Sequence, residues 1–231
     1  MSVITISRQY GSGGDEIAEL ICHNTGYQLF DKHILARAAF EAGISDQEVI
    51  DYSEDNYMVK NFLARLFGIS RPIAQLRVWK EGKDGVRVAE EIQLNEEHAL
   101  SLVRKAIEYA YEIGNIVIMG RGGQVILKDK PDVIHVRIEA DIEDRLVRVR
   151  SYPEQKTQPF SDSVEARRAA QDIIESFDTG SADYLKRFYG VDSSDPLLYH
   201  FIINTSKFSI EHSANLITQV AQQIKPIAEP A

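Results

Sequence analysis

The sequence predicts an α/β fold, with a central and mainly parallel sheet between layers of helices. Strand-like and helix-like patterns alternate along most of the 231 residues, which is the arrangement that produces parallel sheets. Residues 116–119 form a short run of apolar side chains, as expected for a strand covered on both faces. Ligands of such folds bind at the carboxyl ends of the strands, so function is sought in the loops that follow strands.

The length favours one domain over residues 1–231, and 44% hydrophobic with 26% charged residues is an ordinary globular composition. A net charge of −9 argues against a general nucleic-acid-binding surface. Cys22 is the single cysteine, so there is no disulfide framework, and a reducing cytoplasm is favoured. The N-terminus lacks a signal-peptide pattern, and no apolar run approaches the length of a membrane span. We therefore expect a cytoplasmic protein that binds neither membranes nor nucleic acids.

The N-terminal segment contains two predicted strands and two predicted helices. Residues 2–7 alternate and are rich in β-branched side chains, which predicts a buried strand. Ile17, Leu20 and Ile21 recur at helical spacing, so a helix follows, and it is expected to end near Gly26. The second strand and the second helix are expected at residues 27–30 and 31–43.

A polar and mixed segment at residues 45–92 interrupts this order. It carries a weak helical pattern at residues 59–66 and a glycine-containing turn at residues 82–85. We predict that it forms an insertion over the core, which then comprises residues 1–44 and 93–231.

The alternation of helices and strands returns after this insertion. An apolar stripe that includes Leu102, Ile107 and Ile113 predicts a long helix that Gly114 stops. In order, the other expected elements are strands at 116–119 and 133–138, a helix at 141–150, a loop at 151–157, helices at 163–177 and 183–189 around a break at 179–180, a strand at 200–204 and a helix at 209–224.

The loop at residues 8–14 joins the first strand to the first helix and reads Arg-Gln-Tyr-Gly-Ser-Gly-Gly. Backbone N–H groups of such a turn and of a helix N-terminus form a cradle for phosphate oxygens. The common phosphate-binding pattern G-x-x-x-x-G-K-[ST] is broken at three places. Arg8 replaces the first glycine, Gly14 replaces the lysine, and Glu16 replaces the serine or threonine. The cradle is therefore predicted without its usual cation.

Two interpretations of the charged residues around this loop stay open. In the first, Arg8 supplies the missing positive charge through its planar guanidinium, and Glu16 binds Mg²⁺ through its carboxylate. In the second, Asp15 and Glu16 only stabilise the helix dipole and repel a phosphate.

Three more candidate sites follow from position. Arg121 lies between glycines directly after a predicted strand, where a substrate phosphate would arrive; an exposed loop arginine is the alternative. Asp31 and Arg37 lie in the first turns of the second predicted helix and can face one cleft, where the carboxylate would bind hydroxyls and the guanidinium a phosphate. The alternative is that Asp31 caps the helix and Arg37 is solvated. Arg145 and Arg148 share a helical face before a polar loop, which fits either a phosphate-covering lid or a solvated face.

With these residues in order, the chain resembles the cytidylate kinase-like family, a divergent branch of the P-loop nucleoside monophosphate kinases. The resemblance runs over most of the chain. It rests on residues 4–14, on 29–32 with Arg37, on 119–123 with 136–145, and on 184–190 with 195–199 and 203–205.

The resemblance implies a P-loop NTPase-type three-layer fold, with a nucleoside-monophosphate-binding insertion at 45–92 and a lid at about 151–183. It implies transfer of the γ-phosphoryl group of ATP to CMP or dCMP, with Mg²⁺. Glu16 is the metal ligand on this hypothesis. The residues predicted to bind ATP are Gly11, Ser12, Gly13, Gly14, Asp15, Glu16, Arg145 and Arg148; those for the acceptor are Asp31, Arg37, Arg121 and Asp178; and those that stabilise the transferring charge are Arg8, Arg121, Lys186 and Arg187.

The sequence departs from true cytidylate kinases in four places. Gly14 stands at the lysine position, Gly122 stands where an aspartate follows the glycine-arginine pair, and Thr179 and Ser181 stand where lid arginines are expected. Missing cations damage phosphoryl transfer more than they damage binding. The alternative hypothesis is therefore a non-catalytic nucleotide-binding or regulatory relative.

A third hypothesis is a dinucleotide-dependent oxidoreductase. Gly11 and Gly13, with Asp31 about 20 residues later, fit part of that fingerprint. Its third glycine would be Glu16, which would lie against the pyrophosphate. The sequence leaves the identity of the acceptor and the oligomeric state open, a homo-oligomer included.

Overall fold

The computed structural model describes residues 2–30, 75–81, 87–93, 96–152 and 164–224. The chain divides into two compact units, one made of Met1–Leu29 and Gly114–Ala231 and the other of Phe30–Ile113. The single domain, its insertion at 45–92 and its lid at 151–183 stay predictions.

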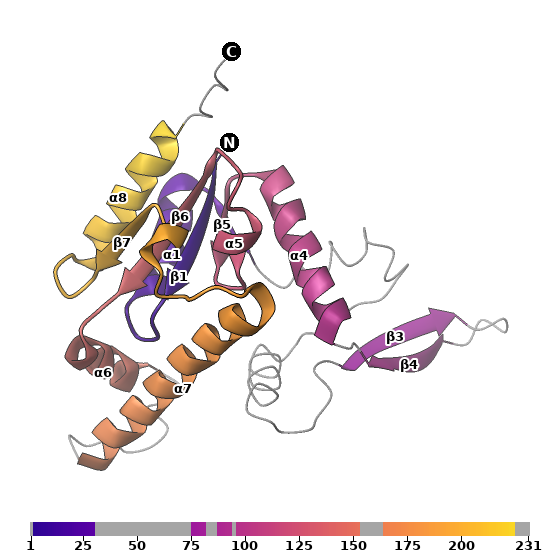
Figure 1. Ribbon diagram of the computed structural model, residues 1–231, viewed down its shortest axis with the longest axis horizontal. Coiled ribbons are helices and arrows are strands. Elements are labelled where there is room, and N and C mark those ends of the chain that lie inside the picture. Colours follow the sequence, from indigo (N-terminus) through magenta and orange to yellow (C-terminus); the bar gives the residue numbers. More distant parts are fainter. Residues whose placement is uncertain (1, 31–74, 82–86, 94–95, 153–163, 225–231) are drawn as a thin grey trace. The chain divides into compact units, whose positions relative to one another are not determined.

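A five-stranded sheet forms the centre of the first unit (Figure 1). In spatial order its strands are β2 (Gln28–Leu29), β5 (Ile116–Met119), β1 (Val3–Arg8), β6 (Val133–Glu139) and β7 (Phe201–Asn204). All neighbouring strands in it are parallel. The predicted α/β fold with a parallel sheet is confirmed.

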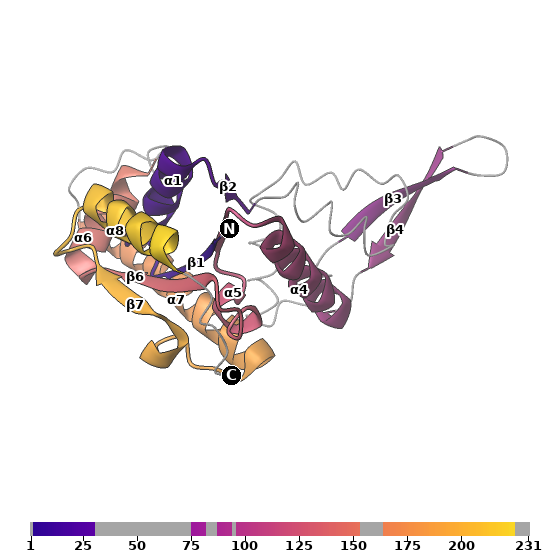
Figure 2. The same ribbon diagram turned by 90° about the horizontal axis from the view of Figure 1, so that it is seen from above.

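One face of this sheet is apolar and carries the main core. Side chains alternate across a strand, so Ile4, Ile6, Val136 and Ile138 share this face. They pack against buried residues of α1 (Gly14–Thr25) and α8 (Ile210–Gln223), such as Ile17. Figure 2 shows α1 and α8 close to each other beside the strands.

The opposite face of the sheet carries polar side chains on β1 and β6, beside the buried Ile116 and Ile118 of β5. Thr5 and Ser7 of β1 lie in register with His135 and Arg137 of β6. The His135 Nδ1 atom lies 2.7 Å from the hydroxyl of Thr5, and its ring stacks on His200 at 5.1 Å between centroids. The short helix α5 (Gly123–Ile126) contacts β1 on this side. The row of polar side chains therefore continues toward the carboxyl ends of the strands.

Two helices pack together near those carboxyl ends, α6 (Ile142–Ser151) and α7 (Val164–Tyr189). Leu146, Val149, Ala170 and Ile174 form their shared apolar cluster. Figure 1 shows α7 passing below the ends of β1 and β6.

The predicted break at residues 179–180 is wrong, because α7 runs through it without interruption. A threonine and a glycine inside a helix together cost about 1–2 kcal/mol of helix propensity. Gly180 is buried in this helix, and tertiary packing along α7 outweighs that cost.

The second unit contains an antiparallel strand pair and a long helix. β3 (Gln75–Glu81) pairs with β4 (Arg87–Gln93), and α4 (Glu96–Ile113) matches the predicted long helix. The sequence analysis missed the strand pair because its residues are polar and mixed. It also missed α5 and the 3₁₀ turn η2 (Pro196–Leu198), which are too short to show a period. The helix expected at 31–43 and the pattern at 59–66 lie outside the described residues.

The turn between β1 and α1 lies directly on α6. Gly11 has a left-handed backbone, with φ of +77°. A Cβ atom on Gly11 would lie 2.7 Å from a methyl of Val149 and 3.0 Å from the backbone oxygen of Arg145. Only glycine satisfies both the conformation and the close contact. Within the described residues, no helix has the length and apolar character needed to cross a membrane.

His135 makes stability depend on pH. It is 4% exposed, and burial, with the charge of His200 second, lowers its pKa from 6.5 to about 4. Between these values the unfolded chain binds a proton that the folded chain excludes, so stability falls as pH falls from 6.5 toward 4. We expect this group to remove about 2 kcal/mol between pH 7 and pH 5, measured by urea unfolding.

The control for this prediction is His135→Asn, which keeps a hydrogen-bonding group beside Thr5. We expect it to be less stable at pH 7 and to lose about 2 kcal/mol less than the wild type between pH 7 and pH 5. An unchanged pH dependence in the variant would assign the acid sensitivity to other groups.

Gly11 and Gly26 form a matched pair for testing the close contact on α6. Both have a left-handed backbone, but a Cβ on Gly26 would meet nothing within 4 Å. Gly26→Ala should destabilise by about 1 kcal/mol through backbone strain alone, whereas Gly11→Ala should cost roughly 1–3 kcal/mol more. Thermal and urea unfolding measure both, and equal losses would contradict the packing explanation.

Candidate active site

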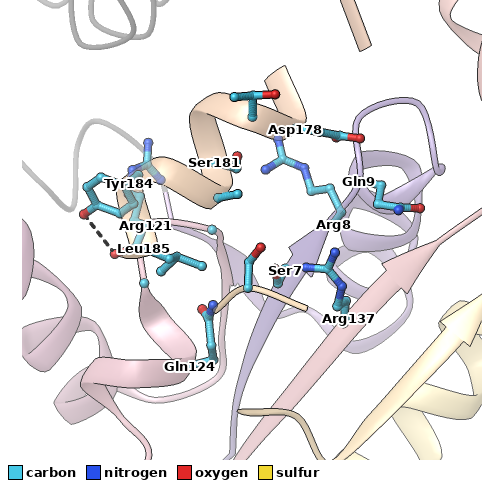
Figure 3. A pocket seen from close by; sticks show the side chains of 15 residues that line it. Ser7, Arg8, Gln9, Arg121, Gln124, Arg137, Asp178, Ser181, Tyr184 and Leu185 are labelled. Atoms are coloured by element: carbon cyan, nitrogen blue, oxygen red, sulfur yellow. Dashed lines mark hydrogen bonds between the residues drawn. The ribbon is translucent and has the colours of Figure 1, made fainter. Parts of the chain in front are cut away.

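A pocket of about 320 Å³ lies between the carboxyl ends of the strands and α7 (Figure 3). Arg8 ends β1, Arg121 follows β5, and Arg137 belongs to β6, and all three line this pocket. Residues of α7 from Asp178 to Leu185 line the other side. Of the described residues that line it, Asp178 is the acidic one, so the pocket is positively charged.

The stem of Arg8 lies against Gly14, the position at which the common loop pattern has a lysine. A Cβ atom on Gly14 would lie 2.8 Å from the Cβ and 3.2 Å from the Cγ of Arg8. The stem of Arg8 therefore fills the space in which a side chain at position 14 would begin. Its Nη1 atom would be 3.5 Å from a Cβ on Gly120, so the guanidinium extends from the N-terminus of α1 to the loop after β5.

An ion pair with Asp15 holds the guanidinium of Arg8 in this position. The Nη2 atom of Arg8 lies 3.0 Å from Oδ1 of Asp15, and the two side chains are 31% and 54% exposed. Such a partly exposed pair contributes about 0–1 kcal/mol, since solvent screens it. A phosphate dianion can therefore compete with Asp15 for the guanidinium.

An ion pair of Arg145 with Asp178 supports the loop at Tyr10. Nε of Arg145 donates to the carbonyl oxygen of Tyr10 at 2.8 Å, and Asp178 accepts from the N–H of Tyr10 at 2.8 Å. The ring of Tyr10 stacks on Phe177 with centroids 4.2 Å apart. One residue of α6 and one of α7 thus hold both backbone polar groups of Tyr10.

The next two carbonyl oxygens of the loop, those of Gly11 and Ser12, also accept hydrogen bonds from side chains. Arg148 donates to the carbonyl of Gly11 at 3.3 Å, and the Thr205 hydroxyl donates to the carbonyl of Ser12 at 2.6 Å. Arg148 also donates to the carbonyl of Thr205 at 3.1 Å. Arg145 and Arg148, predicted to bind ATP, therefore lie against the loop and support its backbone.

Several polar groups at the start of α1 are left without a partner among the described residues. The Nε of Arg8, the hydroxyl of Ser12 and the Oε2 of Glu16 are buried and accept or donate no hydrogen bond there. The first N–H groups of α1, at Gly14 and Asp15, have no intrahelical acceptor. Buried polar groups are ordinarily satisfied, so this set fits phosphate oxygens and, at Glu16, a cation.

The carboxylates of Asp15 and Glu16, in the first turn of α1, affect the pKa of a neighbouring tyrosine. The pKa of Tyr152 is raised, first by burial and then by the negative charges of Glu16 and Asp15. Within the described residues, no group of three or more His, Cys, Asp or Glu side chains is arranged to hold a metal ion. Among the described residues, Glu16 would therefore offer a metal ion a single carboxylate, and phosphate oxygens would have to supply other ligands.

Arg121 is held in a strained conformation at the edge of the pocket. Its φ is +58°, between Gly120 at +62° and Gly122 at +77°, although it is not a glycine. A Cβ on Gly122 would lie 2.7 Å from the ring of Tyr189, and the hydroxyl of Tyr184 donates to the carbonyl of Arg121 at 3.4 Å. α7 therefore packs on this loop, and Figure 3 shows Arg121 and Tyr184 side by side.

Other predicted residues lie away from the pocket or outside the described chain. Lys186 and Arg187 are exposed in the last turns of α7 and do not line the pocket, and Arg187 lies 5.3 Å from the ring centre of Phe188. Asp31 and Arg37 lie outside the described residues. Thr179 and Ser181 line the pocket, while the predicted cradle residues form the turn beside it: Gly11, Ser12, Gly13, Gly14, Asp15 and Glu16.

Sequence reasoning missed several residues of the pocket, among them Ser7, Gln124 and Arg137. Arg137 carried a readable signal, because it is a charged residue inside an otherwise apolar strand of a parallel sheet. Ser7 and Gln124 carried no such signal, since polar residues near a strand end and in a short helix are ordinary.

The chain is similar to known proteins in sequence. Residues 3–207 match the model of the cytidylate kinase-like family. A protein of Aeropyrum pernix named cytidylate kinase is 30% identical over 142 residues, which cover 60% of this chain and 76% of that protein.

Two solved structures match the chain over nearly all of its length, and the first of them is similar in fold. An uncharacterized protein from Eubacterium ventriosum has a TM-score of 0.59 at 17% identity, covering 96% of this chain and 99% of that one. A shikimate kinase from Bacteroides thetaiotaomicron has a TM-score of 0.48 at 14% identity, covering 96% and 98%. With the family match extending over nearly its whole length, the chain belongs to the cytidylate kinase-like family.

Proposed function

We propose that the chain is a nucleoside monophosphate kinase, which transfers the γ-phosphoryl group of ATP to CMP or dCMP with Mg²⁺. The observation that carries this proposal is the position of Arg8, whose stem lies over Gly14 and whose guanidinium reaches the pocket beside the loop. Family membership and the name of the Aeropyrum relative support the nucleotide chemistry. A cytoplasmic location belongs to the same proposal.

In this proposal the turn at residues 11–14 binds the phosphates of ATP through its N–H groups and the hydroxyl of Ser12. Mg²⁺ would neutralise phosphate charge, with Glu16 as its protein ligand. Arg8 stands between this cradle and the pocket, so it can contact the phosphoryl group during transfer. Arg121 binds the acceptor phosphate from the loop after β5. Phosphoryl transfer asks mainly for positioning and charge stabilisation, which these groups supply.

A nucleotide-binding protein without phosphotransfer is the second candidate. Thr179 and Ser181 line the pocket where family resemblance would place arginines, so the α7 side offers hydroxyls and no guanidinium there. Asp15 also engages Arg8. This candidate predicts saturable binding of CMP or ATP with no product.

The first test is formation of CDP from ATP, CMP and Mg²⁺ by the purified protein. We expect turnover well above the uncatalysed rate, and we expect Arg8→Ala to lower kcat/KM by about 10²–10³-fold, since one donor to the developing charge is lost. Arg168→Ala is the matched control, because Arg168 is an exposed arginine of α7 that does not line the pocket.

Full activity of Arg8→Ala would contradict the role of Arg8. No CDP from folded wild-type protein, together with saturable nucleotide binding, would favour the second candidate. Removal of Mg²⁺ by a chelator should abolish turnover in the wild type.

A second test moves the positive charge from position 8 to position 14 and places glycine at position 8. Gly14→Lys alone should be destabilised and inactive, because its Cβ would overlap Arg8, whereas the backbone at Gly14 has no left-handed strain. Arg8→Gly alone lacks a loop cation. The double variant Arg8→Gly with Gly14→Lys should be at least about tenfold more active than either single variant, as expected for coupled neighbours. Activity no better than the singles would show that the two positions are not exchangeable.

A further inference from the structure

Arg137 is a buried arginine of the pocket whose place in the fold is unusual. It lies in β6, in register with Ser7 of β1, and its side chain is 10% exposed. Nε donates to Oε1 of Glu139 at 2.6 Å, and Nη1 lies 3.5 Å from both the Ser7 hydroxyl and the Tyr199 hydroxyl. These two last distances are at the limit of a hydrogen bond, so the guanidinium keeps donor capacity toward the pocket.

The ion pair with Glu139 does not account for this burial. Arg137 and Glu139 are two residues apart on one strand, so their pair joins no separate elements of the fold. Burying a guanidinium costs several kcal/mol unless it is paired and fully hydrogen-bonded, and an apolar residue of similar size is often as stable. Burial lowers the pKa of Arg137, but the hydrogen bond with Glu139 and the nearby Tyr199 raise it above its ordinary value. The buried group is therefore a permanent cation.

Three carboxylates in and around the pocket each pair with an arginine, so none of them is left to repel an anion without a cation beside it. Asp15 is paired with Arg8, Glu139 with Arg137, and Asp178 with Arg145. In Figure 3, Arg8 and Arg121 lie on either side of Ser181, and Arg137 lies beside Ser7, below Arg8 in this view. A ligand that enters the pocket thus meets three arginines, Arg8, Arg121 and Arg137.

We propose that Arg137 binds the phosphate of the acceptor, together with the hydroxyl of Ser7, and so selects a phosphate monoester over an unphosphorylated nucleoside. The inference rests on the proposed function and adds a residue to its acceptor site. The planar fork of arginine matches two phosphate oxygens, and low water access strengthens each contact. A positive charge at this position also offsets the repulsion between the acceptor phosphate and the phosphates of ATP.

The test is equilibrium binding of CMP and of cytidine, measured by calorimetry on the full chain without ATP. The wild type should bind CMP much more tightly than cytidine. Arg137→Gln should weaken CMP binding by about 10–100-fold, the value of one or two hydrogen bonds to a charged group, and leave cytidine binding unchanged. In the CDP assay, KM for CMP should rise more than kcat falls.

Glu139→Gln is the matched control, because it breaks the same ion pair and keeps the guanidinium. Glu139 does not line the pocket. We expect this variant to retain CMP affinity within about threefold, as for a neutral substitution outside the contact. Equal losses in Arg137→Gln and Glu139→Gln would show that the arginine has only a structural role, and the proposal would fail.

The remaining outcomes separate this inference from the proposed function. Arg137-dependent CMP binding without CDP formation would keep the phosphate site and reject the kinase. CDP formation with an unchanged CMP affinity in Arg137→Gln would reject the phosphate site and keep the kinase. If Arg137→Gln does not fold, Arg137→Lys keeps the charge and loses the fork, and we expect it to weaken CMP binding about tenfold. Unchanged affinity in that variant would overturn the proposal.

Discussion

The ion pair between Arg145 and Asp178 is the interaction on which the candidate site depends. It holds the N–H and the carbonyl of Tyr10, so the loop after β1 cannot move independently of α6 and α7. Arg145 is 5% exposed, so removal of Asp178 would leave a buried charge without its counterion. Because Asp178 also lines the pocket, the same contact places the pocket wall of α7 relative to the loop.

The second constraint is steric and lies at the start of α1. Two side chains cannot begin in the volume above Gly14, and Arg8 occupies it. A loop that takes its cation from the end of β1 must therefore have glycine at the first position of the helix. The unusual arginine and the missing lysine are thus two consequences of one arrangement, which keeps a positive charge at the cradle.

The sheet separates stability from function through its two faces. Ile4, Ile6 and Val136 bury an apolar surface under α1 and α8 and need no chemistry there. The opposite face carries Thr5, His135 and Arg137, whose burial is costly unless hydrogen bonds or ligands compensate it. Alternation along a strand makes both faces from the same short segments, so a residue such as Arg137 reaches the pocket from within the core.

The sequence by itself determined the strands of the sheet, the helices α1, α6 and α8 and the glycine-rich turn after β1, because period, β-branched content and glycine placement are local properties. Only the tertiary structure decided that α7 continues through Thr179, since packing outweighs propensity, and that Arg145 supports the loop backbone. It alone placed Arg8 over Gly14 and Arg137 beside Ser7, because contacts between distant segments depend on three-dimensional register and close packing, which no local pattern encodes.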